Sequence, residues 1–217
     1  YGLPTNQYCW IIHPRKQVYR SSQTRDCLGW IHRVVNLRLG LNQGELHFPE
    51  DEPNMEECIT LSNPKTLEYE QVRTSLIPGL LKTLNSNQNE RIPQKIFEIS
   101  DVAVLDNTHD TGARNHRKIC IMQLNTSASF EVIHGALCLL MTKIGAVQGK
   151  HYNLKEHADG EDKKYFSKRG ANVMLLGKKI GTIGVLHPEV MENYQLKNPV
   201  SVLELDFAPV WQFFKSQ

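Results

Sequence analysis

Residues 95–104 read KIFEISDVAV and residues 119–122 read ICIM, and these two runs decide the fold. Both are rich in β-branched and aromatic side chains, a composition typical of β-strands. The segment between them, 106–117, is polar, as expected of a long loop that joins two strands. The sequence therefore predicts an antiparallel hairpin at the centre of the fold.

Two amphipathic helices are predicted on either side of this hairpin. Ser75–Asn87 has apolar residues at helical spacing, a serine suited to the N-cap, and Pro78 in the first turn, where its missing N–H does no harm. Phe130–Ile144 follows Ser129 as its cap and carries a second apolar stripe.

The C-terminal third has the pattern of further hairpin-linked strands. Ala171–Leu176 and Ile180–Leu186 read as strands joined by a tight turn at 177–179, a short helix begins at His187, and Val200–Phe207 alternates as a last strand. Runs of such strands mixed with helices indicate an α+β fold. We therefore expect an antiparallel β-sheet flanked by helices and not a doubly wound parallel sheet.

Composition sets limits on the class of protein. With 217 residues, 40% of them hydrophobic, 22% charged, and a net charge of +2, the chain is an ordinary globular one and its charge alone does not indicate a nucleic-acid binder. Its 5 cysteines form no C-x-x-C pair, which argues against a zinc site and favours reduced, cytoplasmic thiols. No apolar run reaches the roughly 18 residues of a membrane span.

Charge is unevenly distributed near the N-terminus. Residues 1–44 contain several basic residues and one acid, Asp26, whereas residues 45–57 contain only acids among their Lys, Arg, Asp and Glu positions. One interpretation is a basic RNA-binding face followed by an acidic linker, and the other is a solvated helix face followed by an exposed loop. A helix is expected over 22–39. The nucleic-acid candidates are Arg15, Lys16 and Arg20, and the candidates for a subunit-facing helix surface are Trp30, Val34 and Leu37.

Five segments, taken together, resemble the β subunits of phenylalanyl-tRNA synthetase. They occur in the family's order and at roughly its spacing between about residues 57 and 210. The Ser100-Asp101 pair is more similar to the eukaryotic or archaeal branch than to the bacterial one. The segments are 63–66 with 72–84, 95–102, 112–115, 130–135 and 180–190.

This resemblance implies a division at residue 56. Residues 57–217 are expected to form the C-terminal core of the β subunit, a degenerate class II aminoacyl-tRNA synthetase fold, and residues 1–56 a divergent segment with the interface helix and the acidic linker. The family's β subunit assembles with a catalytic α subunit as an (αβ)₂ heterotetramer, without a membrane. The holoenzyme uses ATP and Mg²⁺ to attach phenylalanine to tRNA(Phe).

The same resemblance predicts that this chain has no catalytic site. A class II site needs an arginine and an acid on its motif-two strands and a second arginine at the start of its last motif helix, because these groups hold the triphosphate. Glu98 occupies a place like the motif-two acid, but Ile96 stands where the arginine would be. The resemblance places His187-Pro188-Glu189 at the helix start. We therefore expect no catalytic residue, no metal ligand and no cofactor bound by this chain alone.

Several single residues carry open alternatives. Arg73 is a candidate contact for the α subunit or tRNA, or else pairs locally before a helix. Glu98 is a vestigial site residue or an ordinary sheet-face or interface carboxylate, and the second is favoured because charged residues on strands are often simply solvated. His187 is expected to begin a helix and to be satisfied by backbone. Lys168 stands where the family has a small residue before Arg169.

Three functions therefore compete. The first is a noncatalytic subunit region that assembles with and positions the α subunit. The second is an RNA-binding module that uses the basic N-terminal residues. The third is an orphan structural fragment without a ligase partner.

Overall fold

The computed structural model describes residues 31–33, 59–62, 71–158 and 162–216. The chain divides into two units, 1–31 and 32–217, and the fold below is that of the second. Its centre is the predicted hairpin, in which β2 (Gln94–Leu105) and β3 (Ala113–Leu124) pair antiparallel along all 12 residues of each strand. The loop is shorter than expected, because the polar residues 113–118 continue the backbone pairing beyond the apolar part of the strand.

Among the described residues the hairpin belongs to a sheet of seven strands with the order β1-β2-β3-β7-β6-β5-β4. Along this order, each strand from β2 through β3, β7, β6 and β5 to β4 pairs antiparallel with the next one. This confirms the predicted α+β fold with an antiparallel sheet. The remaining strands are β1 (Ile31–Arg33), β4 (Tyr152–Glu156), β5 (Tyr165–Leu175), β6 (Lys178–Leu186) and β7 (Val200–Asp206).

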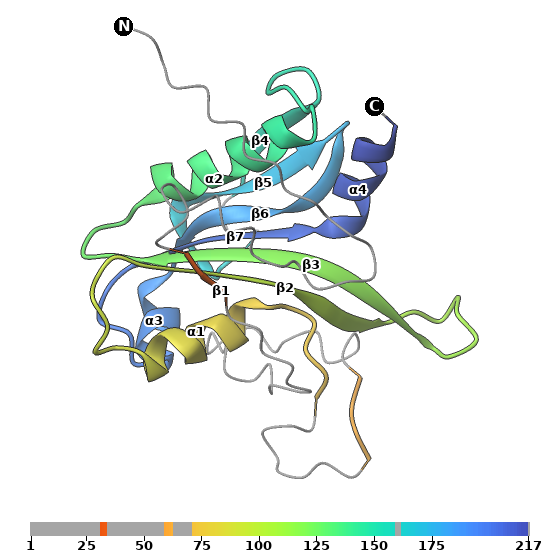
Figure 1. The fold of residues 1–217 in the computed structure, drawn as a ribbon. Coiled ribbons are helices and arrows are strands. Elements are labelled where there is room, and N and C mark those ends of the chain that lie inside the picture. Colours follow the sequence, from red (N-terminus) through yellow and green to blue (C-terminus); the bar gives the residue numbers. More distant parts are fainter. Residues whose placement is uncertain (1–30, 34–58, 63–70, 159–161, 217) are drawn as a thin grey trace, which may run out of the picture. The chain divides into compact units, whose positions relative to one another are not determined.

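Helices cover both faces of the sheet (Figure 1). On one face, called the α1 face below, lie α1 (Ile77–Ser86) and α3 (Pro188–Asn193); on the other lie α2 (Phe130–Lys143) and α4 (Phe207–Lys215). Within the described residues, no helix is long and apolar enough to span a bilayer.

Strand β7 shows why the sheet has two cores. The side chains of Val200 and Val202 join the core beneath α1 and α3, whereas those of Leu203 and Leu205 join the core beneath α2 and α4. All four residues are fully buried. A strand that is covered on both faces carries apolar side chains on both, so it loses the strict alternation of a half-exposed strand.

The two long predicted helices are confirmed as α1 and α2, within two residues at each end. Besides the short strand β1, two elements were not predicted. Strand β4 lies at the sheet edge, and its residues 153–156 are all at least partly exposed, so it has little apolar signal. Helix α4 follows β7 without a loop. Its first turn contains Pro209, and proline usually predicts the end of a helix, although the first turn tolerates it.

The structure describes three residues of the helix expected over 22–39, Ile31–Arg33. They form the strand β1, so the predicted helix is wrong there. The run around them contains Ile31, Val34 and Val35, and β-branched residues favour strands over helices. Gly29 weakens a helix further. The other residues of the expected helix, including the interface candidates Trp30, Val34 and Leu37, lie outside the described residues, as do Arg15, Lys16 and Arg20 and the predicted division at residue 56.

Lys168 has a backbone conformation that explains why a small residue was expected there. Its φ is 59°, in the left-handed region, and the register of β5 against β6 shifts between Tyr165 and Gly170. A side chain with a Cβ is disfavoured in this region by roughly 1–2 kcal/mol, whereas glycine is not.

We therefore expect Lys168→Gly to raise the free energy of unfolding by about 0.5–1 kcal/mol, after allowing for the greater freedom of glycine in the unfolded chain. Urea denaturation of the two proteins measures this difference. A Lys178→Gly variant, at an exposed strand position without a positive φ, is the control and is expected to lose stability.

Candidate functional site

A row of buried polar side chains crosses the α1 face of the sheet. Glu98 on β2 lies opposite Cys120 on β3, Cys120 lies opposite Glu204 on β7, and Glu204 lies opposite Thr182 on β6. All four are less than 10% exposed. The Thr182 hydroxyl also forms a 2.7 Å hydrogen bond with the hydroxyl of Tyr165. Buried carboxylates need partners, so the groups that cover this row decide its chemistry.

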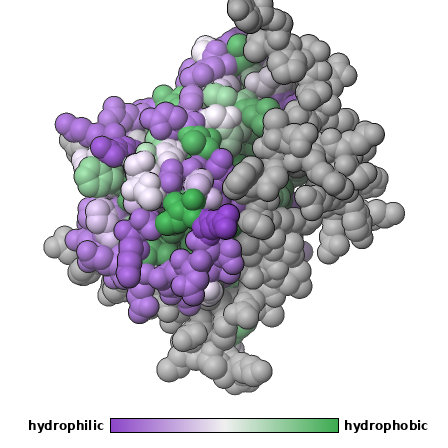
Figure 2. Space-filling view, turned by 60° about the vertical axis from the view of Figure 1, so that its left-hand side comes forward, coloured by the Kyte–Doolittle hydropathy of each residue, from purple (hydrophilic) through white to green (hydrophobic). Residues whose placement is uncertain are grey.

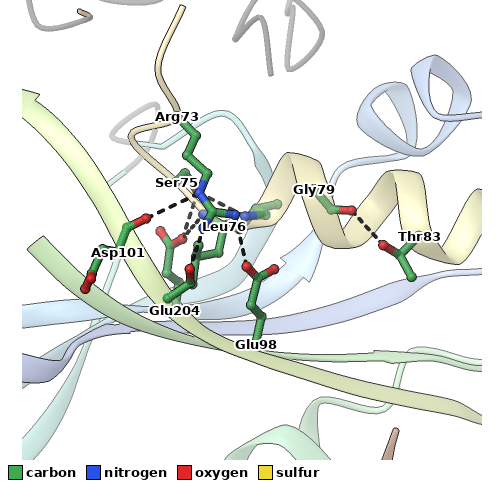
Figure 3. Close-up of polar contacts among 10 residues, drawn as sticks. Arg73, Ser75, Leu76, Gly79, Thr83, Glu98, Asp101 and Glu204 are labelled. Carbon is green, nitrogen blue, oxygen red and sulfur yellow. Dashed lines mark hydrogen bonds and ion pairs between the residues drawn. The ribbon is translucent and has the colours of Figure 1, made fainter. Parts of the chain in front are cut away.

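Arg73 covers one end of the row (Figure 3). Its Nη1 donates to Glu98 Oε1 at 2.9 Å, its Nη2 donates to the Ser100 hydroxyl, and its Nε donates to the Asp101 carbonyl at 3.3 Å. The side chains of Arg73 and Glu98 are only 12% and 2% exposed. The guanidinium therefore forms its hydrogen bonds with residues of this chain and lies against the sheet.

The start of α1 covers the middle of the row. Glu204 Oε1 accepts two hydrogen bonds of 2.8 Å, one from the Ser75 hydroxyl and one from the Leu76 N–H. Its other oxygen lies 3.5 Å from Lys118 Nζ. A carboxylate at the N-terminal end of a helix is favourable because unpaired N–H groups point toward it. Glu204 thus holds the first residues of α1 on the sheet.

The charge on Glu98 depends on Arg73. Burial raises the pKa of the Glu98 carboxyl above its ordinary value, and the nearby Arg73 guanidinium opposes this rise. Within the described part of the chain, Glu98 Oε2 is buried and has no hydrogen-bond partner. A buried ion pair of this kind contributes little net stability but is strongly destabilising when one partner is removed.

Two groups in and beside the row, the Cys120 thiol and the Tyr165 hydroxyl, are uncharged at neutral pH. Burial raises the pKa of the Cys120 thiol and of the Tyr165 hydroxyl well above their usual values, and the neighbouring carboxylates act in the same direction on Cys120. Since the thiolate and not the thiol is the nucleophile, Cys120 is inert at neutral pH. The Cys120 thiol is therefore a buried structural group and not a nucleophile.

The structure gives the local surroundings of three residues for which the sequence offered alternatives. Glu98 lies on a face of the sheet, as the favoured interpretation has it, but the expectation that it is solvated is wrong: the residue faces the core beneath α1 and is 1% exposed. Arg73 pairs locally, and its contact with a partner subunit stays a prediction. The expectation for His187 is confirmed: it lies at the N-cap of α3, and its Nδ1 accepts from the Glu189 N–H at 3.3 Å.

The resemblance assigned the last motif helix to His187-Pro188-Glu189, and the fold has two helix starts in this region. Those residues begin the six-residue helix α3, whereas the final strand and helix are β7 and α4. The strand alternation of 200–207 hid this helix, because α4 begins at Phe207 directly after the strand. Its first residues are Phe207, Ala208 and Pro209, so this helix start also lacks an arginine.

The sequence comparison identifies the family. Residues 34–207 match the model of the phenylalanyl tRNA synthetase beta chain CLM domain. The chain belongs to this family. It is 46% identical over 157 residues to the phenylalanine–tRNA ligase beta subunit of Drosophila melanogaster, covering 70% of this chain and 26% of the relative. It is 34% identical over 163 residues to the Arabidopsis thaliana protein named phenylalanine–tRNA ligase beta subunit, cytoplasmic, covering 70% and 27%. The chain thus spans about a quarter of these relatives.

The fold is that of a class II aminoacyl-tRNA synthetase core. The crystal structure of pyrrolysyl-tRNA synthetase from Desulfitobacterium hafniense superposes with a TM-score of 0.65 at 15% sequence identity, covering 87% of this chain and 64% of that one. At this identity the likeness establishes the fold alone. It confirms the class II-like core that the β-chain motifs implied.

Sequence reasoning missed Glu204. The residue is an acid inside the apolar run of 200–205, and that contrast was a usable signal, because a buried carboxylate in such a strand needs a specific partner. The partners themselves, Ser75 and Leu76, are more than 120 residues earlier. No periodicity predicts that pairing.

Proposed function

We propose that this chain is a noncatalytic part of the β subunit of a phenylalanine–tRNA ligase. In this role it assembles with a catalytic α subunit as an (αβ)₂ heterotetramer, and the complex attaches phenylalanine to tRNA(Phe) in the cytoplasm with ATP and Mg²⁺. The observation that carries the proposal is the match of residues 34–207 to the β-chain CLM domain. The cytoplasmic location is supported by the name of the Arabidopsis relative.

The α1 face supports the absence of catalysis in this chain. Glu98 is the residue that resembles the motif-two acid, and the space over it is filled by Arg73, which also contacts Ser100 and Asp101. Next to it, the first residues of α1 lie against Glu204. A substrate that approached Glu98 from this face would have to displace both.

The residue types agree with this inference. A triphosphate is held by fixed guanidinium groups, because negative charge must be neutralised in a site that excludes water. The residue two before Glu98 is the uncharged Ile96 on β2. Helices α3 and α4 begin with Pro188-Glu189 and Phe207-Ala208-Pro209, and neither start contains an arginine. Arg73 does not provide the missing guanidinium, since its own is bonded to Glu98. The chain itself is proposed to bind neither ATP nor Mg²⁺.

Co-expression with the α subunit tests the proposed role. The chain and a phenylalanine–tRNA ligase α subunit from a related eukaryote are expected to elute together from a sizing column, at a mass above that of either alone. The matched control is an α subunit of a bacterial enzyme, which is expected to elute separately. If the folded chain eluted alone in both cases, the proposed assembly would be wrong for this chain.

A further inference from the structure

Strand β4 forms one edge of the sheet (Figure 1), and part of that edge has unpaired backbone groups. The His157 N–H donates to the Gly170 carbonyl at 3.2 Å, so the odd-numbered residues of β4 point their backbone groups toward β5. Residues 152, 154 and 156 therefore point theirs to the outer side, because this direction alternates along an antiparallel strand. In the part of the chain that the structure describes, no strand lies on that side.

The segment 147–149 covers only the first of these three outward positions. The Gly149 N–H donates to the Tyr152 carbonyl at 2.9 Å. Among the described residues, the outward backbone groups of Leu154 and Glu156 form no hydrogen bond. The outer edge of β4, meaning Leu154 to Glu156, thus presents two N–H groups and two carbonyls. An extended peptide can add to such an edge as a further strand.

Two exposed apolar side chains lie beside the start of this outer edge. The Val147 carbonyl accepts from the His151 N–H at 2.8 Å, and the Leu176 N–H donates to the His151 carbonyl at 2.7 Å. At 57% and 67%, Val147 and Leu176 are the two most exposed large hydrophobic residues of the described part of the chain. The side of the molecule in Figure 2 shows hydrophobic residues only as small islands among hydrophilic ones. Single exposed apolar residues are ordinary, whereas a pair beside unpaired backbone groups indicates an interaction surface.

The charges of β4 disfavour a second copy of this chain as the occupant. Two such edges that pair antiparallel through all their outward groups place Leu154 of each copy opposite Glu156 of the other. Lys155 then lies directly opposite Lys155 of the other copy, and like charges at such positions are destabilising. Lys155 and Glu156 are both exposed. A strand with an acidic residue opposite Lys155 and a basic residue opposite Glu156 is complementary instead.

We propose that β4 binds an extended segment of another polypeptide, which adds to the outer edge as an antiparallel strand. The segment has an acidic residue opposite Lys155, a basic residue opposite Glu156 and apolar residues at its C-terminal end. Because the edge is already covered at the start of β4, the added strand leaves the sheet there. Its apolar residues then lie over Val147 and Leu176. The proposal concerns β4 alone and does not rest on assembly with an α subunit.

Fluorescence anisotropy of the 217-residue chain with a labelled peptide, STREVTVLS, tests the proposal. In the expected register the arginine, the glutamate and the first valine of the peptide lie opposite Glu156, Lys155 and Leu154. Methylation of the backbone nitrogen of that valine removes an N–H that points at β4, so we expect the Kd to rise about 10-fold or more. Methylation of the glutamate nitrogen, whose N–H points away from β4, is the matched control and is expected to change the Kd by less than about 2-fold.

Charge reversal tests the register of the added strand. Lys155→Glu is expected to raise the Kd of this peptide about 5-fold, because a pair of opposite charges across the strands becomes a pair of like charges. A second peptide, STRKVTVLS, has lysine in place of the glutamate and is expected to show the reverse preference. A structural effect of the substitution alone would weaken both peptides.

A third variant tests the apolar contact. Leu176 has a φ of 49°, and asparagine accepts a positive φ, so Leu176→Asn removes the apolar side chain without new backbone strain. We expect it to raise the Kd about 3-fold or more. Leu105→Asn removes a leucine that is 42% exposed on β2, far from β4 in the strand order, and is the matched control. Thermal melting of each variant checks that the fold is kept.

Amide hydrogen exchange followed by NMR locates the bound peptide. We expect the peptide to protect the amides of Leu154 and Glu156, whereas the amides of Asn153 and Lys155 face β5 and are protected without it. The proposal is overturned if the peptide does not bind at up to about 1 mM, if the two methylated peptides bind alike, or if the Leu154 and Glu156 amides stay unprotected. It is also overturned if the chain elutes as a dimer with these two amides protected in the absence of peptide, because a second copy would then occupy the edge.

Discussion

Replacing Arg73 by alanine is expected to lower the free energy of unfolding by about 3–5 kcal/mol, the usual result of leaving a buried charge without its partner. The guanidinium makes contacts with Glu98, Ser100 and Asp101, and the Glu98 side chain is only 2% exposed. Urea denaturation of the purified chain, followed by circular dichroism, measures the change.

The Arg117–Asp101 pair is a matched control in the same hairpin. Its shortest contact is 2.8 Å, close to that of Arg73–Glu98, but both side chains are 47% exposed. We expect Arg117→Ala to change the free energy of unfolding by at most about 1 kcal/mol, because water screens an exposed pair. If Arg73→Ala were as mild as Arg117→Ala, the buried pair would not hold the α1 face in the way described.

The loss in the Arg73→Ala variant is also expected to depend on pH. The ordinary pKa of Glu98 is 4.5, burial raises it in the folded state, and the variant lacks the guanidinium that opposes the rise. A carboxyl whose folded pKa is above its unfolded pKa binds protons more strongly when folded, so stability falls as pH rises between these two values. The difference between wild type and variant should therefore be smallest below the unfolded pKa and largest above the folded one. A difference that grew toward acid pH would contradict this assignment.

Gly181→Ala is expected to lower the free energy of unfolding by about 3 kcal/mol or more, at the upper end of the effects of overpacking. A Cβ at this position would lie 2.1 Å from the Glu204 carbonyl oxygen and 2.8 Å from the Leu205 Cα. These are backbone atoms of β7, so they cannot rotate away, and β6 must separate from β7. The displacement would also move Glu204, which holds the start of α1.

Gly135→Ala is the control for this substitution. Gly135 lies in α2, and a Cβ there would meet no atom within 4 Å. Alanine is favoured over glycine inside a helix, so we expect this variant to gain about 0.5–1 kcal/mol. Thermal unfolding of both variants measures the two opposite shifts. Equal shifts would show that the close approach of β6 and β7 is not what requires glycine at 181.

The sequence predicted those elements whose pattern is local. The hairpin was recognised from β-branched residues in KIFEISDVAV and ICIM, and α1 and α2 from apolar residues at helical spacing. Strand β4 and helix α4 were missed for the opposite reason. An edge strand can be polar, and a helix that follows a strand without a loop has no separate start signal.

The site was predictable only in part. Resemblance to the family selected Glu98 and Arg73, but the general frequency of solvated charged residues on strands gave no sign that Glu98 is buried. Its side chain is covered by Arg73, which lies 25 positions earlier, and the neighbouring contact between Leu76 and Glu204 joins residues 128 positions apart. Long-range contacts of this kind leave no periodic pattern in the sequence. The contrast between Glu204 and its apolar neighbours was the one local sequence feature that indicated such a long-range contact.

The most direct test of the central claim, that this class II fold has lost its adenylation site, is phenylalanine-dependent exchange of labelled pyrophosphate into ATP. The assay is run with Mg²⁺ on the purified chain alone, after melting has shown it to be folded, and on its complex with an α subunit. We expect exchange by the complex and none above background by the chain. Exchange by the chain alone would mean that it forms phenylalanyl-adenylate itself and would contradict the account.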